Sequence, residues 1–159
     1  EKTTEIVLRS LDLNTVAQAV MEEHRALALQ QQHTLTFSPH AEPLPVQADS
    51  DKIKRAVGCL VTNALNYTPA GGHIAIRTYA QEAQAVVEVQ DDGIGISAAD
   101  LPHIFERFFR ADAARNTNRG GMGLGLSITD KIVQAHHGRI EVESAPGAGS
   151  TFRILLPLS

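Results

Sequence analysis

The chain has 159 residues, and the 43% that are hydrophobic are enough for one domain with a core of its own. Its formal net charge of −4 leaves no basic surface for a polyanion, so we expect no nucleic acid partner. A single cysteine excludes an internal disulfide and favours a reducing compartment, and no apolar run has the length of a membrane span or the pattern of a signal peptide.

The first fifty residues predict a linker, a helix and two short strands. Residues 1–10 are polar, and we expect a linker or the end of an upstream helix there, with the domain proper starting at residue 11. Residues 11–13 should be extended, and Asn14 is the expected N-cap of the helix that follows. Short apolar or alternating runs predict strands at 33–37 and 46–48, separated by a proline-rich loop.

The rest of the chain predicts two helices and two hairpins. The first helix, capped by Asp49 or Ser50, should end at Pro69, because the residue before a proline is disfavoured in a helix. The second should begin near Gly125. Paired strands are expected at 74–79 with 85–89 and at 139–143 with 151–156. Helices on one face of a mixed, mostly antiparallel sheet predict an α+β fold, a two-layer α/β sandwich.

One helix carries polar groups on a single face. Its apolar residues recur with the helical period, at Ile53, Val57, Leu60, Ala64 and Leu65. A second set of residues shares another face of this helix. Asn63, Asn66 and Tyr67 follow Cys59 by four, seven and eight residues, which is the spacing of residues on one side of a helix. Taken alone, this pattern fits a binding surface and a satisfied buried asparagine beside a core tyrosine equally well.

Two glycine-rich boxes follow this helix. Residues 91–95 read DDGIG after an apolar strand, so Gly93 and Gly95 would let the backbone turn sharply near a flat ligand, and Asp91 would aim a carboxylate at it. Residues 121–125 read GMGLG before a helical pattern, where backbone amides can bind phosphate. Glycines at a helix start are more often plain turn residues. Leu126 and Ser127 also exclude a dinucleotide fingerprint and a P-loop.

The motifs taken together resemble a known family. NALNYTPAGG, DDGIGI with FERFF, and GMGLGL followed by GSTF resemble, in order and spacing, the N, G1, F and G2 boxes of the catalytic ATP-binding domain of sensor histidine kinases, in the superfamily that includes DNA gyrase and MutL. The resemblance extends from about residue 11 to 158. It implies the Bergerat ATP-binding fold, with ATP and Mg²⁺ as ligands.

The resemblance also implies roles for individual residues. Asn63 would ligate the metal through its carbonyl oxygen and, with Arg110 near the phosphates, serve catalysis. Tyr67 would pack against adenine, Asp91 would accept from the adenine amino group, and Thr151 would help to fix that carboxylate. A lid would cover the site at about 111–120. The other implied nucleotide contacts are Asn66, Gly93, Gly95, Ile96, Gly121, Gly123, Leu124, Gly125 and Leu126.

Three positions depart from the family pattern. Cys59 stands where a first asparagine is usual, Asn66 where a lysine is common, and His137 where a glycine is usual. In the gyrase and MutL relatives a glutamate at the position of Cys59 activates water for hydrolysis. Because a thiol stands there instead, the sequence favours a phosphoryl donor over a hydrolase.

The implied partners lie outside this chain. None of the seven histidines has the acceptor context of the family, a His-Glu or His-Asp pair followed by a basic residue and proline. The expected partners are therefore ATP, the dimerisation domain of a parent kinase that carries the acceptor histidine, and a response regulator. We expect a cytoplasmic domain without direct membrane contact, in a parent that could be membrane-anchored. A serine kinase or ATPase of the same superfold, or an interaction module with degraded nucleotide binding, are the alternatives.

Overall fold

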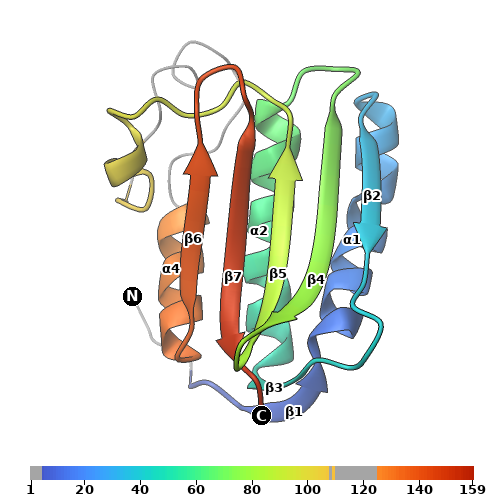
Figure 1. The fold of residues 1–159 in the computed structure, drawn as a ribbon, viewed down its shortest axis with the longest axis vertical. Coiled ribbons are helices and arrows are strands. Elements are labelled where there is room, and N and C mark those ends of the chain that lie inside the picture. The colour runs from blue at the N-terminus through green and yellow to red at the C-terminus, as the bar shows by residue number, and fades with distance from the viewer. Residues whose placement is uncertain (1–4, 108, 110–124) are drawn as a thin grey trace.

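A five-stranded sheet with the long helices packed on one face forms the body of the protein (Figure 1). The structure is a computed structural model that describes residues 5–107, 109 and 125–159. The strand order is β2-β4-β5-β7-β6; β2 pairs with β4 in parallel, and the other neighbours are antiparallel. The expected α+β sandwich with a mostly antiparallel sheet is thus confirmed.

The described elements follow the expected order closely. They are β1 (Arg9–Asp12), α1 (Leu13–Gln30), β2 (Thr34–Ser38), β3 (Pro45–Ala48), α2 (Ser50–Tyr67), β4 (His73–Gln81), β5 (Gln84–Asp91), the short 3-10 helix η1 (Leu101–His103), α4 (Gly125–Ala135), β6 (Arg139–Ser144) and β7 (Ser150–Pro157). Among the described residues, no helix is both long and apolar enough to pass through a membrane.

Helix α2 lies centrally against the sheet because one of its faces is entirely apolar. Its buried residues are Ile53, Ala56, Val57, Leu60, Val61, Ala64 and Leu65. The Asp49 side chain caps the helix by accepting the Lys52 N–H at 3.3 Å, which decides between Asp49 and Ser50, the two caps that the sequence allowed. The helix ends at Tyr67, with Thr68 as the C-cap before Pro69. Burial of this face fixes the direction in which the polar residues of α2 point.

The expected cap of α1 was wrong. Asp12, and not Asn14, is the N-cap, and its carboxylate accepts the N–H of Asn14 at 3.0 Å. The Asn14 carboxamide instead donates to the backbone carbonyls of His40 and Glu42, which lie in the loop before β3. Aspartate and asparagine can both cap a helix, so the local sequence does not decide between Asp12 and Asn14. The contacts of Asn14 with a loop distant in sequence decide it.

The segment before α1 is tied to the domain. Strand β1 starts at Arg9, inside the expected linker, and pairs antiparallel with β3. The N–H of Val7 donates to the Asp49 carboxylate at 3.1 Å, and this bond is the main cause that lowers the pKa of Asp49. The chain entering the domain therefore contacts the N-cap residue of α2.

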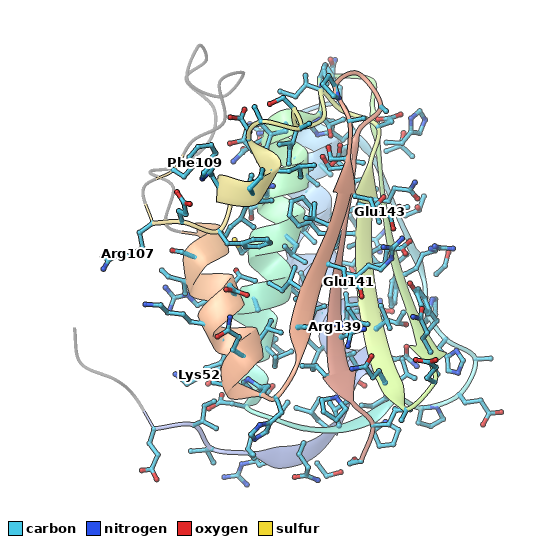
Figure 2. All side chains as sticks on the ribbon, turned by 60° about the vertical axis from the view of Figure 1, so that its left-hand side comes forward. Lys52, Arg107, Phe109, Arg139, Glu141 and Glu143 are labelled. Carbon is cyan, nitrogen blue, oxygen red and sulfur yellow. The ribbon has the colours of Figure 1, made fainter. Side chains whose placement is uncertain are left out.

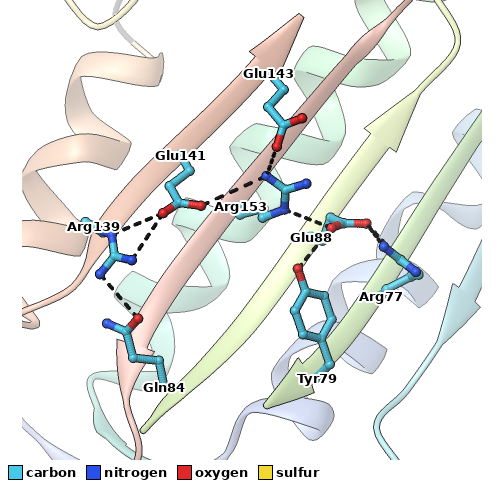
Figure 3. Close-up of polar contacts among 8 residues, drawn as sticks. All are labelled: Arg77, Tyr79, Gln84, Glu88, Arg139, Glu141, Glu143 and Arg153. Atoms are coloured by element: carbon cyan, nitrogen blue, oxygen red, sulfur yellow. Dashed lines mark hydrogen bonds and ion pairs between the residues drawn. The ribbon is translucent and has the colours of Figure 1, made fainter. Parts of the chain in front are cut away.

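The two faces of β5 have opposite character. Val87, Val89 and Asp91 face the helices, whereas Glu88 faces outward among charged side chains of neighbouring strands (Figure 3). Arg139, Glu141 and Glu143 of β6 point away from the helices on the same outer face (Figure 2). The last residue of β5, Asp91, therefore points to the helix side of the sheet, close to the C-terminal end of α2.

Candidate functional site

A cleft of about 360 Å³ opens along α2, between this helix, the segment around η1 and the start of α4. Its floor is the polar face of α2. The residues that line it are Arg55, Cys59, Thr62, Asn63, Asn66, Tyr67, Ile104, Phe109, Gly125 and Leu126. The shared face predicted from the helical spacing is therefore confirmed. Gly125 of the second glycine box and Leu126, the residue after it, line the same cleft.

Asn63 of α2 lines the cleft, and its side chain is available for a ligand as far as the described residues are concerned. It is half-buried, and its carboxamide makes no hydrogen bond within the described part of the chain. Ile104, Phe109 and Leu126 supply apolar surface to the same cleft, and Figure 2 shows Phe109 beside η1, near the beginning of α4. An amide oxygen beside apolar walls suits a ligand that has both a flat and a polar part.

Asp91 lies at the end of β5, close to the end of α2. Only 7% of its surface is exposed, and its Oδ1 accepts the N–H of Gly93 at 2.9 Å. Burial raises the pKa of this carboxyl; the backbone N–H groups of Gly93 and Ser150 lower it, but not enough to cancel burial. No ion pair to Asp91 forms among the described residues, so its oxygens keep capacity for a donor from outside.

The loop after Asp91 joins the two halves of the site. The N–H of Ile94 donates to the carbonyl of Tyr67 at 3.1 Å. A Cβ at Gly93 would come within 2.2 Å of that same carbonyl oxygen, so only glycine permits this approach. The carboxylate at Asp91 is in this way held next to the last turn of the cleft helix.

Gly95 is required by the protein's own packing. Its φ is +74°, and a Cβ there would lie 1.9 Å from the carbonyl oxygen of Ala145. Sequence reasoning assigned Gly93 and Gly95 to a close approach of ligand, but the structure shows that both lie against backbone of neighbouring segments. Ile96 packs against the core, and its N–H donates to Ser144 Oγ at 2.8 Å.

Ser150, and not Thr151, lies across from Asp91. In the antiparallel pair of β5 and β7, Asp91 is opposite Ser150, whereas Thr151 is opposite Gln90 on the outer face. Opposed residues of such a pair have side chains on the same face of the sheet. The residue on the same face as the carboxylate is therefore Ser150, and not Thr151 as the resemblance implied.

The alternation of β7 could have located this residue. Phe152 and Ile154 are buried against the helices. Ser150 lies two residues before Phe152 on the same strand, so its side chain points to the same face. Ser144 Oγ donates to the carbonyl of Gly149 at 2.9 Å, so the 2.7 Å contact between Ser144 Oγ and Ser150 Oγ takes its proton from Ser150. The lone pairs of Ser150 are left to accept from a ligand or a water.

Cys59 contacts the start of α4. A Cβ at Gly125 would lie 2.8 Å from Cys59 Sγ, so the thiol and this glycine are closely packed. Burial raises the pKa of Cys59, while a hydrogen bond with Thr129 and the charge of Arg55 act in the opposite direction. The thiol is therefore neutral near pH 7 and is no general base.

Part of the predicted site lies outside the described residues. Arg110, Gly121, Gly123, Leu124 and the expected lid at about 111–120 belong to this part. Glu106, the nearest described carboxylate to this part in sequence, is exposed and accepts from His103 Nδ1 at 2.8 Å. Sequence reasoning missed Arg55, which a helical projection places one turn before Cys59 on the cleft face.

Comparisons with known proteins agree with this arrangement. Residues 48–159 match the family described as histidine kinase-, DNA gyrase B-, and HSP90-like ATPase. The sensor histidine kinase RppB of Synechocystis sp. is 37% identical over 158 residues, which are 99% of this chain and 35% of that protein. The sensor histidine kinase WalK of Bacillus subtilis is 42% identical over 116 residues, 72% of this chain and 19% of that protein.

Solved structures show the same similarity. The mycobacterial sensor histidine kinase MprB is 30% identical with a TM-score of 0.83, and the match covers 94% of this chain and 98% of that one. Histidine kinase ThkA in complex with response regulator protein TrrA is 26% identical with a TM-score of 0.80, over 97% of this chain and 42% of that one. The chain spans about a third or less of the length of the first curated relatives it matches.

Proposed function

Since the chain belongs to the family of histidine kinase-, DNA gyrase B- and HSP90-like ATPases and is the catalytic ATP-binding domain of a sensor histidine kinase, we propose how its site works. The α2 cleft binds ATP together with Mg²⁺, and the domain donates the γ-phosphate to a histidine on a separate dimerisation domain. This is the chemistry of two-component signal transduction.

The observation that carries the proposal is a buried carboxylate that has no cation partner among the described residues and is held next to the last turn of the cleft helix. Asp91 is held by two backbone N–H groups and still has acceptor capacity, which the amino group of adenine can use. The neighbouring loop contacts Tyr67, a lining residue of the cleft whose ring would offer a flat surface to the base. A guanine ring presents a carbonyl at the corresponding position, so the same carboxylate disfavours it.

The residues of the cleft fit a magnesium ion that is bound mainly by the nucleotide. Among the described residues, no cluster of three or more His, Cys, Asp and Glu side chains could hold a metal. Mg²⁺ commonly keeps several waters and takes phosphate oxygens, so it needs few protein ligands. Asn63 would supply an amide oxygen, because its carboxamide makes no hydrogen bond to any residue that the structure describes. The bound ion would neutralise phosphate charge.

The described cleft is built for transfer more than for hydrolysis. Phosphoryl transfer asks a protein chiefly to position its substrates and to neutralise charge. None of the described lining residues is a carboxylate, and Cys59 holds its proton near pH 7. No described group of the cleft can therefore activate water as a general base. The γ-phosphate is kept for an acceptor supplied by another domain.

The further partners follow from the same proposal. The dimerisation domain of a parent kinase would bring the acceptor histidine, and a response regulator would receive the phosphoryl group from it. ThkA, which shares this fold, was solved in complex with the response regulator TrrA. A cytoplasmic location stays a prediction from the single cysteine.

A transfer assay tests the proposal. The chain is mixed or fused with a dimerisation domain that carries an acceptor histidine, and radiolabelled ATP is added with Mg²⁺. We expect an acid-labile phosphohistidine on the added domain, lost in Asn63→Ala and retained in Gln90→Ala, which removes an exposed carboxamide from the outer face. Rapid ATP hydrolysis without transfer would instead favour the ATPase alternative, and absence of ATP binding would favour a degraded interaction module.

A further inference from the structure

The cleft contains one charged side chain among its described lining residues, and it is Arg55. Arg55 lies on α2 one helical turn before Cys59 and two turns before Asn63, so all three follow the same face. Its side chain is exposed and forms no hydrogen bond or ion pair within the described residues. The arginines of the outer sheet face differ, because Arg77, Arg139 and Arg153 are each paired with a glutamate.

The charge of Arg55 acts inside the cleft. Burial raises the pKa of the Cys59 thiol, and the positive charge of Arg55 opposes that effect. The guanidinium is thus close enough to influence an atom of the cleft wall. Asn63 and Asn66, the polar residues further along the helix, are neutral, so the described cleft has no other cation for a phosphate.

The position of Arg55 matches the far end of a nucleotide. The base end of the site is marked by Asp91 and Tyr67, at the C-terminal end of α2. A helix rises about 1.5 Å per residue, so Asn63 lies about 6 Å and Arg55 about 18 Å from Tyr67 along the axis. A triphosphate that passes Asn63 is directed toward Arg55, whose long side chain can move along the helix surface to meet it.

We propose that Arg55 binds the terminal phosphate of the nucleotide and so distinguishes a triphosphate from a diphosphate. The inference rests on the proposed function, in which the α2 cleft holds ATP. A guanidinium suits this task because its planar donors can engage two phosphate oxygens at once. Since Arg55 has no protein partner to leave, binding phosphate breaks no existing contact among the described residues.

Calorimetric titrations with two nucleotides test this role. The whole chain and its Arg55→Gln variant are titrated with ATP and with ADP, each with Mg²⁺. We expect Arg55→Gln to weaken ATP binding by about fivefold to tenfold, as for loss of a partly solvated charge-assisted bond, and ADP binding by less than about twofold. Arg55→Lys, which keeps the charge without the fork, should fall between the two for ATP.

The matched control is Lys54→Gln. It removes the same charge from the neighbouring residue of the same helix, but Lys54 does not line the cleft. It should leave both affinities unchanged. Equal losses in the two variants, equal losses for ATP and ADP in Arg55→Gln, or no loss at all would each overturn the role of Arg55. If the unmodified chain bound no ATP, the proposed function itself would fail.

Discussion

Strand β5 carries two buried carboxylates, Glu88 and Asp91, whose pKa values are shifted in opposite directions by their surroundings. Glu88 is 1% exposed and faces outward, and Asp91, three residues on, is 7% exposed and faces the helices. Burial raises the pKa of Glu88, but hydrogen bonds from Arg77, Arg153 and Tyr79 outweigh it, so the pKa is lowered. Burial also raises the pKa of Asp91, and there the two backbone N–H groups do not outweigh it.

The surroundings of Glu88 explain its role. Arg77 Nε and Arg153 Nε donate to its two oxygens at 2.8 and 3.0 Å, and the Tyr79 hydroxyl donates at 3.1 Å. Arg153 continues to Glu143 at 2.6 Å, and charges of alternating sign cross β4, β5, β7 and β6 (Figure 3). Arg77 Nη2 donates a fourth bond, so each oxygen of Glu88 accepts two donors and the carboxylate links β5 to β4 and β7.

The difference separates stability from binding on one strand. Breaking a buried charge cluster whose partners are all internal destabilises the fold, whereas a buried charge with free acceptor capacity costs folding energy and is available for a ligand. The outer face is therefore expected to affect unfolding and not nucleotide affinity. The helix face around Asp91 is expected to do the reverse.

The largest effect is expected for Glu88→Ala. Removal of this carboxylate leaves two arginines and a tyrosine without their shared acceptor, and we expect the free energy of unfolding to fall by about 2–3 kcal/mol. Urea denaturation followed by circular dichroism measures this change. The affinity for ATP, measured below the denaturation range, should stay within about twofold of the unmodified chain. A selective loss of ATP binding would show that the two faces are not separate.

Asp91→Ala should have the opposite profile. We expect ATP binding to weaken by about 1.5–3 kcal/mol, about tenfold or more, because a charge-assisted hydrogen bond to adenine is lost. Discrimination between adenine and guanine nucleotides should weaken with it. The loss of unfolding free energy should be smaller than in Glu88→Ala, since Asp91 has no salt bridge among the described residues. Unchanged ATP affinity in a folded variant would remove Asp91 from the site.

Two adjacent hydroxyls make the comparison sharper. Ser150 shares the face of Asp91, and Thr151 shares the face of Glu88. We expect Ser150→Ala to weaken ATP binding by about 1 kcal/mol, about fivefold, and Thr151→Ala to leave it unchanged. Calorimetry of the two variants under one set of conditions decides between them. A loss of ATP binding in Thr151→Ala but not in Ser150→Ala would assign the contact to Thr151 and would contradict the strand register.

The smallest expected effect concerns the pH dependence of stability. The contribution of Glu88, whose folded pKa is lowered, is present above the ordinary glutamate value of about 4.3 and is lost as pH falls through the folded pKa. The contribution of Asp91, whose folded pKa is raised, is present below the ordinary aspartate value of about 3.9 and is lost as pH rises through the folded pKa.

The two carboxylates should therefore respond to acid with opposite sign. On acidification from about pH 6 to pH 3, the stability advantage of the unmodified chain should shrink relative to Glu88→Gln and grow relative to Asp91→Asn. Urea denaturation across this range measures both differences. Parallel curves for the two variants would mean that the carboxylates are not distinguished by their surroundings.

Local patterns made much of this fold predictable. The period of α2 and its cap at Asp49 depend on residues that are close in sequence, so the cleft face could be foreseen. The partners of Glu88 could not, because Arg77 and Arg153 come from other strands and only the sheet register brings them together. The same register decides between Ser150 and Thr151, and a one-residue shift moves a side chain to the other face.

Mapping of backbone amide chemical shifts on the ¹⁵N-labelled chain tests the central claim most directly. Mg²⁺ and a non-hydrolysable ATP analogue are added to saturation. We predict large shifts for the amides of Asn63, Gly93 and Gly125 around the cleft, and none beyond noise for those of Glu88 and Arg153. Shifts confined to the outer face, with the cleft amides unchanged at saturation, would contradict the assignment of the nucleotide site.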